Sequence, residues 1–128
     1  FGQHVRHILE FHECLLGNLH HEVFSYDRRR RDLRLETEID VARGSLERCI
    51  HALRTITSDR SLVMESELPG VDLISAQRTT LKRELVYLAD HSVHHLAMMR
   101  IVLEQELPSI SFPEHLGVAA STRNHRSR

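Results

Sequence analysis

His91-Ser92-Val93-His94-His95 lies in the middle of a long stretch with helical periodicity. A helix turns by about 100° per residue, so His91 and His95 lie one above the other on one face and can bind the same ion. His94 points away from both by the same rotation. The apolar stripe around these histidines comprises Leu81, Leu85, Leu88, Leu96, Met99, Leu103 and Leu107. It predicts a helix over 75–107, which Pro108 ends.

Apolar residues at intervals of three and four predict two more helices upstream, over 2–19 and 36–57. In the second of these the expected core face comprises Ile39, Ala42, Leu46, Cys49, Ile50, Leu53 and Ile56. The basic segment 25–32 has no helical period and reads as a loop. The segment 58–70, closed by Pro69-Gly70, reads as an extended connection with a turn. The tail from Ser109 is expected to be irregular.

Length and composition favour one all-α domain over residues 1–128. The chain is 41% hydrophobic and 5% aromatic, with 5 glycines and 3 prolines, which suits a helical protein better than a β sandwich. Three amphipathic helices do not close a four-helix bundle. We therefore expect either an additional N-terminal helix upstream of Phe1 or cover from a partner chain. A homodimer is the expected assembly.

The charge pattern argues against several classes of partner. The 17 basic and 18 acidic side chains give a net charge of −1, so the molecule has no general attraction for nucleic acid or anionic membranes. The single basic run Arg28–Arg31 offers only a small surface for contact with nucleic acid. No signal peptide or membrane-spanning run is recognisable, which predicts a cytoplasmic protein. Cys14 and Cys49 occupy helical apolar positions and are expected to be buried free thiols.

The histidine pair needs a third ligand to form a metal site. The first helix offers His4, His7 and His12, and three histidines with open positions are typical of catalytic zinc or nickel sites. By periodicity, His4 lies closer than His7 to the centre of the apolar stripe, so the pattern mildly favours His4. The alternative is that some of the 11 histidines are spaced by chance and are merely hydrogen-bonded in the core.

Several motifs together resemble the DinB-like (DinB/YfiT) superfamily of bacterial metalloenzymes. They are Gly2-Gln3-His4-Val5-Arg6-His7-Ile8, Tyr26-Asp27 with Arg29, Arg31 and Asp32, Glu36, His91-Ser92-Val93-His94-His95, and Gly117-Val118-Ala119-Ala120-Ser121-Thr122. The resemblance implies an up-down four-helix bundle, here lacking its opening helix, with a metal held by three histidines. Carried over to this chain, these ligands are His7, His91 and His95. Leu96-Ala97-Met98 departs from the Arg-Gly-Gln that commonly follows the last histidine.

The resemblance also implies a class of reaction, because relatives include S-transferases that use low-molecular-weight thiols. We expect a divalent metal, zinc or nickel, to lower the pKa of a bound thiol or water on a small-molecule substrate. Arg29 and Arg31 are expected to bind a carboxylate of the thiol or substrate, unless their loop is simply solvated. Glu84 and Tyr87 are candidate proton carriers, and the catalytic residue is otherwise unknown. The alternative function is a non-catalytic, metal-binding or stress-linked structural bundle.

Overall fold

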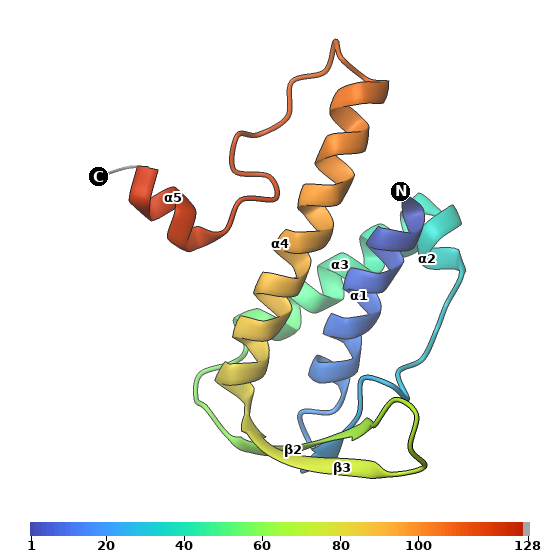
Figure 1. The fold of residues 1–128 in the computed structure, drawn as a ribbon, viewed down its shortest axis with the longest axis vertical. Helices are drawn as coiled ribbons and strands as arrows, with labels where there is room; N and C mark the ends of the chain where they lie inside the picture. Colours follow the sequence, from blue (N-terminus) through green and yellow to red (C-terminus); the bar gives the residue numbers. More distant parts are fainter. Residues whose placement is uncertain (127–128) are drawn as a thin grey trace.

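The computed structural model describes residues 1–126, which contain five helices and a three-stranded sheet (Figure 1). The elements are, in order, α1 (Gly2–Gly17), β1 (Val23–Phe24), α2 (Arg34–Thr37), α3 (Ile39–Arg54), β2 (Ser61–Glu67), β3 (Ile74–Thr80), α4 (Leu81–Glu106) and α5 (Ala120–Arg126). The prediction of an all-α four-helix bundle is therefore wrong, because a sheet occupies part of the described chain.

The sheet has the order β1-β2-β3. Strand β1 pairs with β2 in parallel, and β2 forms an antiparallel hairpin with β3. Strands β2 and β3 pair from Ser61 with Thr80 to Glu67 with Ile74. Gly70 has a φ of 79° in the connecting turn, a conformation that glycine adopts without steric cost. The extended segment and the turn were predicted. The helix predicted from residue 75 is wrong over 75–80, where tertiary pairing with β2 decides the conformation.

Helix α4 begins where the sheet ends. The Thr80 side chain accepts a hydrogen bond from the Arg83 backbone N–H at 3.2 Å and so caps the helix. Leu81, the first helical residue, is almost fully buried. The apolar period that predicted a helix is thus obeyed from Leu81 onward, and the six residues before it belong to β3.

Helix α1 is the central helix, because it packs against α2, α3 and α4. It runs antiparallel to α4, and the sheet lies across the lower ends of both (Figure 1). The core lies at this junction and comprises Phe11, Leu15, Phe24, Tyr26, Leu62, Leu81 and Leu88. Burial of these side chains fixes the two helices side by side, which positions the histidines they carry.

Helix α3 differs from its prediction in extent and in the face it buries. Residue Glu38 is extended and separates α2 from α3, so the predicted helix over 36–57 is broken near its start. Most of the expected core face is exposed, namely Ile39, Leu46, Ile50 and Leu53. The helix meets α1 instead through small residues: Ser45 is fully buried and donates to a Glu13 carboxylate oxygen at 2.6 Å.

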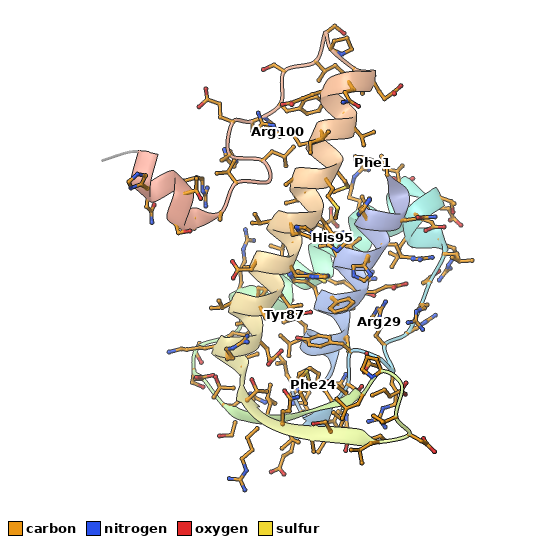
Figure 2. The ribbon with its side chains drawn as sticks, in the orientation of Figure 1. Phe1, Phe24, Arg29, Tyr87, His95 and Arg100 are labelled. Carbon is orange, nitrogen blue, oxygen red and sulfur yellow. The ribbon has the colours of Figure 1, made fainter. Side chains whose placement is uncertain are left out.

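The segment after α4 folds back along that helix. The Arg100 guanidinium, labelled in Figure 2, donates to the carbonyl oxygens of Glu114 and Leu116 at 2.9 and 3.3 Å. Gly117 has a φ of 70°, and a Cβ there would lie 2.5 Å from the Ala97 backbone. The tail was predicted to be irregular, and α5 was missed. Over residues 1–126, no helix is both long and apolar enough to cross a membrane.

Candidate metal centre

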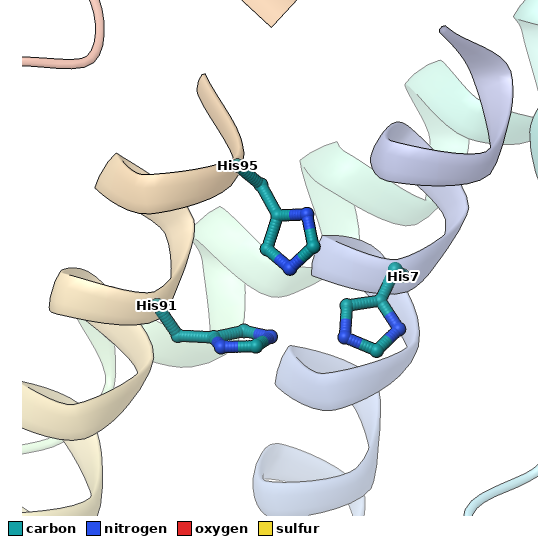
Figure 3. Close-up of side chains that lie close together, drawn as sticks. All are labelled: His7, His91 and His95. Carbon is teal, nitrogen blue, oxygen red and sulfur yellow. The ribbon is translucent and has the colours of Figure 1, made fainter. Parts of the chain in front are cut away.

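Three histidines from two helices meet between α1 and α4 (Figure 3). His7 comes from α1, and His91 and His95 come from successive turns of α4. One ring nitrogen from each lies within 4.8 Å of the others. The structure thus brings together the three residues that the sequence resemblance selected, and all three side chains are partly buried.

The hydrogen bonds indicate which nitrogen of each α4 histidine faces the shared space. The Nε2 atom of His91 is buried and has no partner among the described residues. The Nδ1 atom of His95 lies 2.8 Å from Nδ1 of His4, so the nitrogen left to His95 is Nε2. Figure 3 shows one nitrogen of each of the three rings turned toward the space between them. An unpartnered, buried imidazole nitrogen is an electron-pair donor available to an ion.

The other candidate histidines lie outside this group. His4, which periodicity favoured, contacts His95 and so occupies an outer position beside the three. His12 contacts the carbonyl oxygen of Ile8 at 2.8 Å through Nδ1. His94 is exposed, as its rotation about α4 predicted.

Burial keeps the three rings in their neutral form. It lowers the pKa of His7 to about 4, and the nearby His95 and His91 contribute to the same shift. The pKa values of His91 and His95 are also lowered, chiefly by burial and then by neighbouring histidines. Because a metal binds only the unprotonated imidazole, these shifts leave the three nitrogens ready to coordinate at neutral pH.

Aromatic rings form the wall of the centre on the side of the sheet. The rings of Phe11 and Tyr87 stack on His91 with centroid separations of 4.8 and 5.6 Å. The Tyr26 ring stacks on Phe11 at 4.9 Å. Phe11 and Tyr26 are buried, so they limit the rotamers open to His91. Sequence reasoning assigned Phe11 and Tyr26 no role at the site, although Phe11 follows His7 by one helical turn.

The two arginines predicted to bind a carboxylate have different positions. The Arg29 guanidinium lies 4.5 Å from the centre of the Phe11 ring, and its Nε is 3.5 Å from a carboxylate oxygen of the buried Glu10. Its positive charge contributes to the lowered pKa of His7 and of His91. Arg31 is exposed and, within residues 1–126, does not contact the three histidines. Arg29 is therefore beside the centre and already paired with Glu10, whereas Arg31 is outside it.

Glu84 and Tyr87, the predicted proton carriers, differ in burial and in hydrogen bonding. The Glu84 carboxylate is buried and accepts hydrogen bonds from the Tyr26 hydroxyl at 3.0 Å and the Thr79 hydroxyl at 2.6 Å. It links the loop, the sheet and α4 beneath the centre. Tyr87 is 37% exposed. Burial and the charge of Glu84 raise the pKa of Tyr87, so its hydroxyl keeps its proton at neutral pH.

The N-terminal turn of α1 is held close to α2. A Cβ at Gly2 would lie 2.2 Å from the carbonyl oxygen of Glu36, so only glycine permits this approach. The Arg6 guanidinium lies 3.2 Å from the Glu36 carboxylate. Gly2 and Glu36 both belong to the motifs quoted above, and the structure gives them a packing role that positions His4 and His7.

Comparison with known proteins does not identify a family for this chain. No protein-family model matches the sequence, and no solved structure matches it. The chain is 28% identical over 107 residues to a protein from Rhizopus delemar named FK506-binding protein 5. The match covers 80% of this chain but only 27% of that protein. Nothing in these comparisons supports the DinB-like membership predicted from the motifs, and the sheet overturns the pure helical bundle that it implied.

Proposed function

We propose that this chain binds a divalent metal ion through His7, His91 and His95 and uses it in chemistry on a small molecule. The observation that carries the proposal is the set of three ring nitrogens within 4.8 Å of one another, one of them buried without a partner. In a tetrahedral zinc site, bonds of about 2.0–2.1 Å separate the ligand atoms by about 3.3 Å. The three nitrogens, within 4.8 Å of one another, would have to approach by up to about 1.5 Å to reach that spacing.

The ligand set favours a centre with an open position over a structural one. Structural zinc sites have four protein ligands, whereas catalytic sites have three and keep a position for water or substrate. Within residues 1–126, the group that can hold an ion has three members, and His4 is engaged with His95. When bound, a zinc or nickel ion lowers the pKa of a coordinated water or thiol and so supplies a nucleophile. Imidazole ligands alone do not choose between these metals.

The surrounding residues support a transferase or hydrolase reaction. The Tyr87 ring stacks on His91, and its hydroxyl is protonated at neutral pH, so it can donate a proton to a leaving group. The stacked Phe11 and Tyr26 rings exclude water from one side of the centre. Arg29, held beside the centre by Glu10, helps to keep the pKa values of His7 and His91 low, so that both rings stay neutral and able to bind a metal.

The test is the metal content of the untagged protein, measured by plasma mass spectrometry beside two variants. His91→Ala removes one proposed ligand. His51→Ala removes an exposed histidine of α3 and serves as the matched control for adventitious binding. We expect about one ion per chain in the wild type and in His51→Ala, and loss of the ion in His91→Ala. Equal metal content in all three proteins would overturn the proposal.

A further inference from the structure

A pocket of about 500 Å³ lies on the sheet side of the three histidines. Phe11 and Tyr87, which stack on His91, also line this pocket, so the pocket and the centre share a wall. Figure 2 shows Tyr87 on α4 between His95 and the sheet. A volume of this size suits a small organic molecule. A ligand in the pocket therefore lies against the two rings that stack on His91.

The wall nearest the centre is aromatic and apolar. It is formed by the rings of Phe11, Tyr26 and Tyr87 and by Met64 of β2. Because β2 pairs Met64 with Gln77 of β3, the Gln77 side chain lies on the same face of the sheet as Met64. The flat apolar part of a ligand can pack against these rings, and the side-chain amide of Gln77 is available at the edge of this apolar surface.

Two arginines line the pocket, Arg78 of β3 and Arg83 of α4. Successive side chains of a strand point to opposite faces of the sheet, so Arg78 points away from the face that carries Met64 and Gln77, and Arg83 is the cation on the polar rim. Arg83, in the first turn of α4, lines the pocket, and no ion pair or side-chain hydrogen bond of its guanidinium is present over residues 1–126. The Glu84 carboxylate is occupied by the Tyr26 and Thr79 hydroxyls. One oxygen of Asp27 accepts the Glu67 backbone N–H at 2.9 Å. The group on the rim that remains open to a charged ligand is thus the Arg83 guanidinium.

We propose that this pocket binds a small molecule with an apolar or aromatic body and an anionic oxygen group, a carboxylate or a phosphate, which pairs with Arg83. A guanidinium forms two parallel hydrogen bonds to either group, so the chemistry is shared by both. The body then lies against Phe11 and Tyr87. The further step, that the opposite end of the ligand reaches a bound ion, rests on the proposed function, whereas the anion site itself does not.

The test is a titration of the metal-free protein with benzoate, phenyl phosphate and the uncharged benzamide, followed by backbone amide NMR shifts. We expect both anions, or one of them, to shift the amides of Thr79, Arg83 and Tyr87. The anion that binds more tightly identifies the preferred group. Benzamide is expected to bind at least tenfold more weakly, because hydrogen bonds to a charged group are worth about that factor or more. Equal binding of benzamide, or no shifts with either anion, would overturn the proposal.

Three variants test which charged residue binds the anion. Arg83→Gln is expected to weaken the anions about tenfold. Lys82→Gln removes the same charge from the neighbouring exposed position, which does not line the pocket, and is expected to leave their affinity unchanged. Asp27→Asn removes a negative charge from the rim and is expected to tighten them. A loss in Lys82→Gln equal to that in Arg83→Gln would refute the assignment to Arg83.

The metal content of Arg83→Gln and the anion affinity of His91→Ala separate this proposal from the proposed function. We expect Arg83→Gln to keep its ion and His91→Ala to keep its anion affinity. A wild-type protein that binds the anions but holds no ion would overturn the metal proposal alone. The converse result would sink the anion site alone.

Discussion

His4→Phe tests whether His4 only positions the centre, in contrast to His7, His91 and His95, which we propose bind the ion. His4 Nδ1 lies 2.8 Å from Nδ1 of His95. When His95 coordinates through Nε2, its Nδ1 carries the proton and donates it to His4, which fixes the ring and makes it a better ligand. Phenylalanine keeps a ring of similar size at this half-buried position but removes the acceptor. Loss of such a partner weakens metal affinity by about 10- to 100-fold, or about 1.4–2.7 kcal/mol.

We expect the zinc affinity to fall in a definite order among the variants of the centre. His91→Ala removes a ligand itself: about 10 kcal/mol of zinc binding shared among three ligands gives about 3 kcal/mol, a loss on the order of 100-fold or more. His51→Ala, on α3, is expected to bind like the wild type. The assay is competition for zinc with a chromophoric chelator at pH 7.5, starting from metal-free protein. Wild-type affinity in His4→Phe would refute the positioning role, and a loss larger than that of His91→Ala would make His4 a direct ligand.

Three further predictions concern pH and stability. The pKa of His7 falls from 6.5 in the unfolded chain to about 4 in the fold. Its contribution to the stability of the fold is therefore complete above pH 6.5 and is lost as the pH falls toward 4. The Tm of the metal-free protein should drop over this range, and it should drop less in His7→Gln. Gly117→Ala forces a side chain onto the α4 backbone at a positive φ and should cost about 2 kcal/mol in urea unfolding, whereas Gly17→Ala, with open space around it, should cost little. A wild-type midpoint in Gly117→Ala would show that the tail does not dock. Tyr26→Phe removes a buried hydrogen bond to Glu84 and should cost about 1–2 kcal/mol by the same method, and an unchanged midpoint would count against that bond.

Local periodicity predicted the helices well where each buries one face. Helix α1 and most of α4 follow the 3.6-residue repeat, and the His91–His95 spacing is a direct consequence of that repeat. Strand β3 was missed because its residues pair with residues of β2 that lie 7 to 19 positions away in the chain, and a local pattern does not encode that pairing. Helix α5 was missed because it has no apolar stripe.

The choice between His4 and His7 shows a second limit of local patterns. Both lie near the apolar face of α1, and the sequence does not give the rotation of α1 relative to α4. In the structure, Gly2 against Glu36 and Phe11 against His91 set that rotation, which turns His7 inward and leaves His4 against His95. The resemblance selected His7 for reasons that periodicity does not contain.

The same limit applies to the loop arginines and to α3. Arg29 and Arg31 lie in the same basic loop, and the sequence does not distinguish them. In the structure, Glu10 on α1 and the Phe11 ring hold Arg29 alone beside the centre. The apolar stripe of α3 predicted a core face, yet Ser45 makes the contact with α1. The single domain, the cytoplasmic location, the homodimer and the thiol cofactor stay predictions.

The energetics of the centre explain why metal binding and stability should be coupled. His91 Nε2 is buried without a partner, and an unsatisfied buried group costs about 1–3 kcal/mol. The surrounding core holds it there, because the stacked Phe11 and Tyr87 rings leave His91 little room to turn toward water. The fold therefore carries a cost that an ion bound at this nitrogen, as proposed, would remove. Since the unfolded chain does not hold the three nitrogens together, an ion bound as proposed would favour the folded state and raise its stability.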